Sequence, residues 1–185
     1  MKTTMTILST LVLLLGACSF QDKQQEAQKI ETKENMFSKM RTMCLGVKPE
    51  QLGLQLSQKE TVIFGVVMDW GMDNATASLC SFQTGDASLY LSSGGGIIGG
   101  GQHESVKKAA IEFISKSQTY LANAEATKST DLPSDKEIFF YLLTNKGTFL
   151  TKDKMSNIES KKSQLTNLFD EANKVLTQLR LISDK

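Results

Sequence analysis

The sequence predicts an α+β domain in which a single antiparallel sheet of about five strands packs against two or three helices. Short apolar segments with strand-like patterning follow one another across turn-forming residues, as the strands of hairpins do. Segments with apolar residues at helical spacing precede, interrupt and close these runs of strands. The strands do not alternate singly with helices, which a doubly wound parallel sheet would need.

The first 17 residues are predicted to be a lipoprotein signal peptide. Lys2 precedes an apolar run that has about half of the roughly 20 residues of a membrane-spanning helix. Leu15-Gly16-Ala17-Cys18 follows this run and resembles the lipobox of bacterial lipoproteins. The resemblance implies cleavage before Cys18 and acylation of Cys18, with diacylglycerol and a further chain such as palmitate. The alternative is a secreted protein that the general signal peptidase cleaves near Ala17.

Residues 18–33 are predicted to be a lipidated tether. They are rich in Gln, Lys and Glu, so they cannot bury enough apolar area to offset the entropy of ordering. Because two or three acyl chains anchor a protein stably, we expect the chain to be held in the bacterial cell envelope through Cys18. Ser19 follows the cysteine, and in a Gram-negative host a residue other than Asp at that position is typical of the outer membrane.

The folded domain is predicted over residues 34–185, and it is expected to begin with a helix and a three-stranded meander. Apolar residues recur at helical spacing from Met36 to Cys44, and Gly46 ends the pattern. Three strand-like segments follow, separated by turn-forming residues. The expected strands are 61–68, 75–82 and 87–92, with turns at 69–74 and 84–86.

The second half of the domain is expected to contain a helix, a hairpin and a long closing helix. Ser156 and Glu159 have the spacing of a capping box, which predicts that the closing helix begins there. The preceding segments are a glycine-rich stretch (94–101), a helix to residue 124, a polar loop (128–134) and two strands (137–144 and 148–151).

This element order resembles that of profilin-like and roadblock-like domains, in which a small sheet flanked by helices binds partners or small ligands. The resemblance is one of topology over about residues 34–181. The segment SLYLSSGGGIIGGG, residues 88–101, also resembles a motif that recurs in bacterial proteins of unknown function, and this resemblance implies no activity.

Charge and composition argue against several classes of function. Lys plus Arg is 21 against 20 for Asp plus Glu, so there is no basic excess to neutralise the phosphates of a nucleic acid. One His and three Cys do not suffice for a His/Cys metal site, and we expect neither a metal nor a cofactor.

The glycine-rich segment is the first candidate site. Gly94, Gly96 and Gly99 satisfy G-x-G-x-x-G between a strand and a helix, where backbone N–H groups can hold a phosphate. No Lys-Ser/Thr pair follows, and Glu104 would repel an anion at the helix start. The alternative is backbone packing, because glycines let a chain cross closely over a sheet. The candidate ligand or partner loop comprises Ser92, Ser93, Gly94, Gly95, Gly96, Gly99, Gly100, Gly101 and His103.

Asp69 and Trp70, at the end of the first expected strand, are candidate recognition residues. Turn formation is the alternative role of Asp69, and closing the end of the core is the alternative role of Trp70. Asp69 or Asp73 could also orient His103, beside Ser92 and Ser93, for hydrolysis. The chain lacks a G-x-S-x-G nucleophile motif, so we assign no catalytic residue.

Cys44 and Cys80 are the thiols that remain after lipidation of Cys18. In an oxidising export compartment they could form a bridge, and two separate buried thiols are the alternative.

Together these features predict a lipid-anchored bacterial envelope protein with a non-catalytic binding domain. Its expected partners are the membrane, through lipid on Cys18, and a protein of the envelope. Two alternatives remain open: an envelope immunity or inhibitor lipoprotein, and an enzyme that acts on a small ligand through the Gly94–Gly101 loop.

Overall fold

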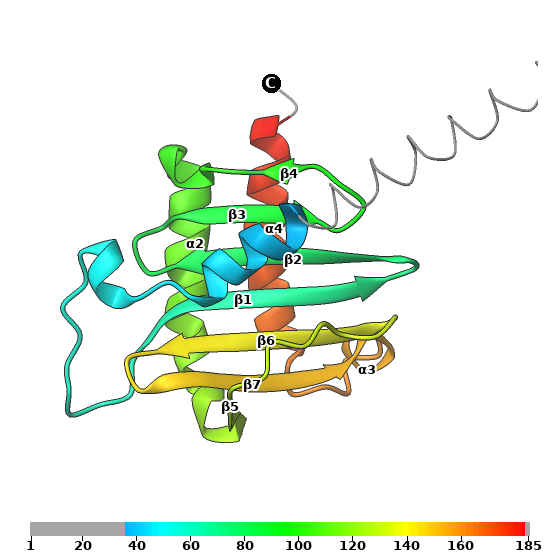
Figure 1. The fold of residues 1–185 in the computed structure, drawn as a ribbon. Coiled ribbons are helices and arrows are strands. Elements are labelled where there is room, and N and C mark those ends of the chain that lie inside the picture. The colour runs from blue at the N-terminus through cyan, green and yellow to red at the C-terminus, as the bar shows by residue number, and fades with distance from the viewer. Residues whose placement is uncertain (1–35, 184–185) are drawn as a thin grey trace, which may run out of the picture. The chain divides into compact units, whose positions relative to one another are not determined.

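The structure is a computed structural model that describes residues 36–183. The predicted signal peptide, the lipidation site Cys18 and the tether lie outside the described residues. The described part confirms the α+β class, with one antiparallel sheet and several helices (Figure 1). The expectation of about five strands was wrong, because the sheet has seven strands in the order β4-β3-β2-β1-β6-β7-β5.

The strands are β1 (Ile63–Met72), β2 (Ala75–Phe82), β3 (Ala87–Leu91), β4 (Gly96–Ile97), β5 (Glu125–Thr127), β6 (Glu137–Thr144) and β7 (Gly147–Lys154). The helices are one over residues 36–45, α2 (Glu104–Ser117), α3 (Met155–Glu159) and α4 (Thr166–Ser183). Short 3-10 helices occur at η1 (Pro49–Leu52), η2 (Gly100–Gln102) and η3 (Gln118–Asn123).

The centre of the sheet is the antiparallel pair of β1 and β6, which lie far apart in the sequence. Met68 on β1 stands opposite both Leu79 on β2 and Phe140 on β6, and all three side chains are fully buried. Apart from Asp69, the large side chains on both faces of β1 are apolar, as is typical of a central strand that is covered on both sides.

Two hydrophobic cores therefore lie on opposite faces of the sheet. Helices α2 and α4 cover one face, where Val66, Phe113 and Leu168 are among the fully buried residues. The 36–45 helix covers part of the other face, where its residue Phe37 packs in one cluster with Val67 of β1. Figure 1 shows the resulting three layers, with α2 and α4 behind the sheet and the 36–45 helix in front.

Residues 69–72 continue β1, so the prediction of a turn over 69–74 was too long. The turn is restricted to Asp73 and Asn74, and Asn74 adopts a φ of 61° that suits a tight hairpin. The polar residue Asp69 resembled a turn residue in the sequence, but it has a buried partner in the fold.

The closing segment contains two helices, so the prediction of one long helix was wrong. Helix α3 ends at Glu159, and α4 begins at Thr166 after a reversal in which Lys161 has a φ of 56°. The predicted capping box is absent, because the N-cap residue of α3 is Lys154 and makes no side-chain cap.

No helix within residues 36–183 is long and apolar enough to cross a membrane.

Candidate functional site

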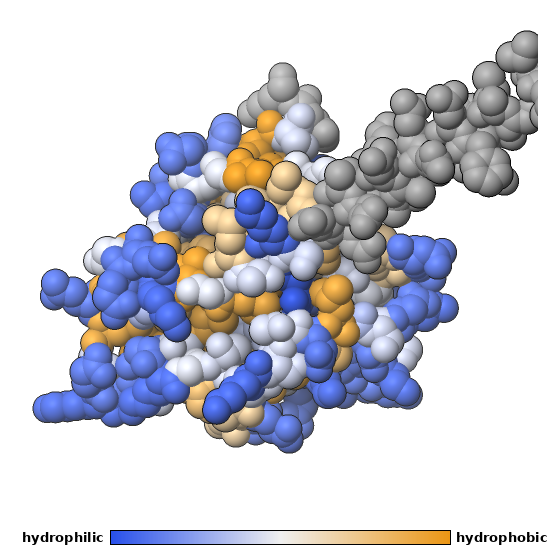
Figure 2. Space-filling view, viewed as in Figure 1, coloured by the Kyte–Doolittle hydropathy of each residue, from blue (hydrophilic) through white to orange (hydrophobic). Residues whose placement is uncertain are grey.

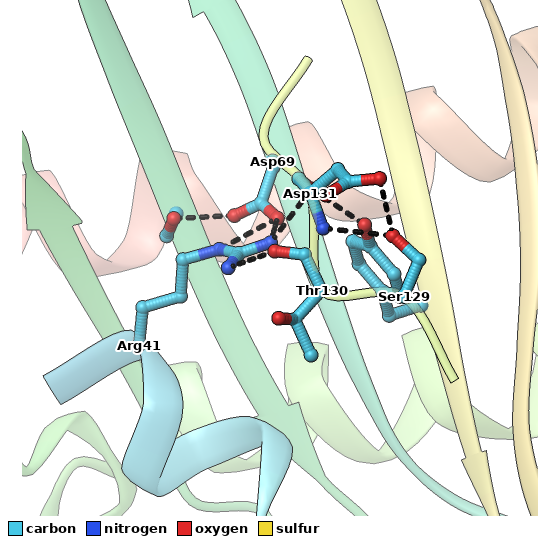
Figure 3. Close-up of polar contacts among 7 residues, drawn as sticks. Arg41, Asp69, Ser129, Thr130 and Asp131 are labelled. Carbon is cyan, nitrogen blue, oxygen red and sulfur yellow. Dashed lines mark hydrogen bonds and ion pairs between the residues drawn. The ribbon is translucent and has the colours of Figure 1, made fainter. Parts of the chain in front are cut away.

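A buried ion pair joins the 36–45 helix to the centre of the sheet (Figure 3). Nε and Nη2 of Arg41 donate hydrogen bonds to one carboxylate oxygen of Asp69, at 2.9 and 2.6 Å. The hydroxyl of Ser78, on β2, donates to the other oxygen of that carboxylate. The two charged side chains are 7% and 0% exposed.

The same arginine holds the segment that precedes β6. Its Nη1 donates to the carbonyl oxygen of Thr130 at 2.7 Å, and its Nη2 donates to that of Asp131 at 3.1 Å. The hydroxyl of Tyr141 donates to the Asp131 carbonyl at 2.5 Å, and the guanidinium lies 5.5 Å from the Tyr141 ring centroid. We call these four side chains and two carbonyls the Arg41 network: Arg41, Asp69, Ser78, Tyr141, Thr130 and Asp131.

Burial and charge act in opposite directions on the ion pair. Burial raises the pKa of the Asp69 carboxyl, and the hydrogen bonds and charge of Arg41 offset only part of this effect. Burial alone would lower the pKa of Arg41, but the hydrogen bonds and charge of Asp69 outweigh it and raise that pKa. The guanidinium therefore stays charged, and it fixes one helix, two strands and one loop relative to each other.

A pocket of about 510 Å³ lies beside this network. We call it the junction pocket, because its walls come from the 36–45 helix, from the ends of the β1–β2 hairpin and β3, and from the segment before β6. Its lining residues are Phe37, Ser38, Arg41, Gly71, Met72, Asn74, Ala75, Thr76, Ser92, Leu132, Pro133 and Asp135. This mixture of apolar and polar side chains suits a partner that presents both kinds of group.

Of the two predicted recognition residues, only Asp69 belongs to this site. Trp70 points to the opposite face of the sheet, where its ring meets Phe169 of α4 edge-on at 5.7 Å. Trp70 is thus packed against the core covered by α4, which is the alternative that the sequence left open.

Ser92 connects the predicted glycine-rich loop to the junction pocket. Its hydroxyl accepts a hydrogen bond from the backbone N–H of Thr76 at 2.7 Å, and both residues line the pocket. The glycines of the predicted loop lie farther along the chain, in the turn after β3, in the edge strand β4 and at η2. Ser93 belongs to that turn.

The structure gives packing reasons for several of the glycines. Gly96 has a φ of 152°, and a Cβ there would lie 2.2 Å from the carbonyl oxygen of Leu89 on β3. At Gly100 a Cβ would lie 2.4 Å from Leu179 of α4, and at Gly101 it would lie 2.5 Å from Asp86. The glycines thus let the chain pass closely over β3 and α4.

His103 and Asp69 are not brought together. His103 is an exposed residue at the N-cap of α2, which packs on one face of the sheet. Asp69 bonds to Arg41 on the opposite face. Within the described chain, no group of three or more His, Cys, Asp or Glu side chains is placed to hold a metal ion.

Arg41 is the central residue of this network, and sequence reasoning missed it. It lies four residues after Phe37 and three before Cys44, both buried, so its helical spacing places it on the buried side of the helix. A charged residue at such a position is the signal of a buried partner.

Comparisons of the chain with protein-family models, with curated proteins and with solved structures find no match.

Proposed function

We propose that this chain is a lipid-anchored protein of the bacterial envelope whose domain binds a segment of a protein partner without catalysis. The observation that carries the binding part is the junction pocket, whose three walls are held together by the Arg41 network. A pocket fixed in this way is ready for a ligand before the ligand arrives, which lowers the entropic cost of binding.

The chemistry of the pocket favours binding over catalysis. Its hydroxyl residues are Ser38, Thr76 and Ser92, and the one histidine of the chain lies at the start of α2 on the other side of the sheet. A serine or threonine hydroxyl needs an adjacent base, most often a histidine, to act as a nucleophile.

A protein segment suits the pocket better than a small polar ligand. Leu132 is 46% exposed at the pocket, and Phe37, Met72 and Pro133 add apolar lining. Figure 2 shows apolar side chains in several separate patches among hydrophilic ones on the face that carries the 36–45 helix.

The envelope part of the proposal depends on Leu15-Gly16-Ala17-Cys18. Replacing Cys18 by Ser should leave an unprocessed precursor without acyl mass, which mass spectrometry of the intact chain would detect. An N-terminus at another residue in the unaltered protein, without lipid, would refute the anchor.

Site-specific photo-crosslinking tests the binding part in producing cells. A photoreactive residue at Leu132 should yield a discrete adduct with one envelope protein, identified by mass spectrometry. The matched control is Ile111, which is 41% exposed on α2 and lies on the other side of the sheet. Equal adducts at both positions, or none at Leu132, would contradict binding at the junction pocket. An adduct that contains a toxin or an enzyme would favour the immunity or inhibitor form of the proposal.

A further inference from the structure

Cys44 and Cys80 meet beneath the 36–45 helix. Cys44 is near the end of that helix, and Cys80 is in the middle of β2, opposite Val67 on β1. Both belong to the core on this face of the sheet, and both are thiols in the structure. Each thiol shifts the pKa of the other, so the two side chains are neighbours in this core although 36 positions separate the residues in the sequence.

The two thiols differ in their access to solvent. Cys44 is 8% exposed and lines an open, largely apolar cavity of about 420 Å³, together with Met40, Met43 and Tyr90. Cys80 is 0% exposed and lies behind it. A reagent from solvent therefore reaches Cys44 first, and Cys80 only through Cys44.

The hydrogen bonds around the pair match this order. The Cys80 thiol donates to Cys44 and lowers the pKa of Cys44, while burial and the nearby Asp69 carboxylate act against this shift. The Tyr90 hydroxyl is a second donor to Cys44, and burial raises the pKa of Tyr90 to about 12, so it keeps its proton. Burial also raises the pKa of the Cys80 thiol. Cys44 is therefore the better nucleophile of the two.

We propose that Cys44 and Cys80 form a dithiol–disulfide switch, in which Cys44 is attacked first and Cys80 resolves the intermediate. The oxidant is a disulfide of the thiol–disulfide exchange class. The Cys44 thiolate attacks one sulfur of that disulfide, forms a mixed disulfide and releases the other half as a thiolate. The Cys80 sulfur then attacks the Cys44 sulfur, which forms the Cys44–Cys80 bond and breaks the mixed disulfide, and the Cys80 proton passes to the departing sulfur so that the second half leaves as a thiol.

Oxidation would tie the 36–45 helix covalently to the sheet. Phe37, Ser38 and Arg41 of that helix line the junction pocket, so the bond would stabilise one of its walls. This chemistry belongs to the folded domain and goes beyond the proposed function. It does not depend on the lipid anchor, although an exported protein would meet such oxidants.

The test treats the reduced full chain with oxidised glutathione, blocks the remaining thiols and maps the peptides by mass spectrometry. The expected product is a peptide pair joined through Cys44 and Cys80, whose mass is lower by two hydrogens than that of the two thiol peptides. The oxidised protein should also melt at a higher temperature than the reduced one, and a reducing agent should reverse the change.

Two single variants test the order of attack. Cys80→Ala should accumulate glutathione on Cys44, whereas Cys44→Ala should leave Cys80 unmodified while the protein is folded. Tyr90→Phe should slow the first step without preventing the disulfide. If Cys80 were modified in Cys44→Ala, or if the unaltered chain took up glutathione on Cys44 without forming the Cys44–Cys80 bond, the proposal would be wrong. None of these results depends on lipid or on a partner, so they are separate from the tests of the proposed function.

Discussion

Arg41 and Asp69 illustrate how a charged pair is retained between a helix and a sheet. Removing both charges from water costs several kcal/mol per ion, and their mutual attraction offsets this only when the remaining donors and acceptors are also satisfied. Ser78 and the carbonyls of Thr130 and Asp131 supply those additional hydrogen bonds. The pair therefore specifies which segments come together more than it adds to stability.

Removing one partner should be more harmful than removing both. Arg41→Met and Asp69→Leu should each lower the free energy of unfolding by about 3–5 kcal/mol, because each leaves a buried charge without its partner. The double variant should recover a large part of that loss, as measured by urea denaturation. Lys39→Met, on an exposed position of the same helix, is the control and should change little. Additive losses in the double variant would contradict this account of the pair.

Substitutions at Gly96 and Gly99 distinguish the cost of a positive φ from the cost of a steric clash in the glycine-rich segment. Gly99→Ala should cost about 1–2 kcal/mol, since Gly99 has a φ of 75° and a Cβ there meets nothing within 4 Å. Gly96→Ala should cost more, because its Cβ would collide with the Leu89 carbonyl and push β4 from the sheet. Chemical denaturation would give both values. Equal losses would contradict the steric role of Gly96. A loss of partner crosslinking at Leu132 without a loss of stability would instead support a ligand-binding role for these glycines.

Among the elements, those with a periodic apolar pattern were predicted, and those held mainly by backbone pairing were not. The strands near residues 75–82 and 137–144 were predicted at their observed bounds, because nearly every residue in them is buried. The edge strands β4 and β5 have only two and three residues, which is too short for any periodicity. The break between α3 and α4 also escaped prediction, although residues 160–164 are all polar, because Ser156 and Glu159 have the spacing of a helix start and the helical apolar pattern begins at Leu165.

Glu171 joins helices α4 and α2 and makes the stability of the fold depend on pH. On α4 it is hydrogen-bonded to Lys116 of α2 at 2.6 Å and to Lys174 at 2.8 Å. Partial burial would raise the pKa of Glu171, but the two lysines outweigh it and hold that pKa below its ordinary value. The folded state therefore favours the ionised carboxylate.

Glu171→Gln should lower the free energy of unfolding by about 0.2–1 kcal/mol at pH 7. The stabilisation by Glu171 is fully present above the pKa of the unfolded chain, at about 4.3, and is lost as the pH falls through the lower pKa of the folded state. Urea denaturation from pH 7 to pH 3 should show the difference between the two proteins shrink in that range. A difference that stays constant down to pH 3 would show that Glu171 acts through packing alone.

At the scale of the whole molecule, the candidate site was only partly predictable. Asp69 and Ser92 were named from the sequence, but Arg41 and Leu132 were not. The junction pocket combines residues from position 37 to position 135, and no local pattern indicates which of them meet. The glycine-rich segment was conspicuous in composition, yet close backbone packing accounts for much of it.

The start of the folded unit can be located by truncation. Deleting residues 19–33 should leave the melting temperature unchanged, because that segment has few apolar residues to pack. A deletion that extends to residue 46 removes Phe37 and Cys44 from the core and should lower the melting temperature by at least about 10 °C. Circular dichroism on heating would measure both. A drop of several degrees on the shorter deletion would place residues 19–33 in the fold.

The pairing of β1 with β6 also sets the order in which the chain can fold as it is made. Strand β1 (residues 63–72) has both of its neighbouring strands only after residues 137–144 of β6 have been synthesised. Until then, the meander exposes the unpaired edge of an apolar strand, which is a template for aggregation. A nascent chain released near residue 123 would present that edge to other chains, so a holding chaperone is most needed over that interval of synthesis.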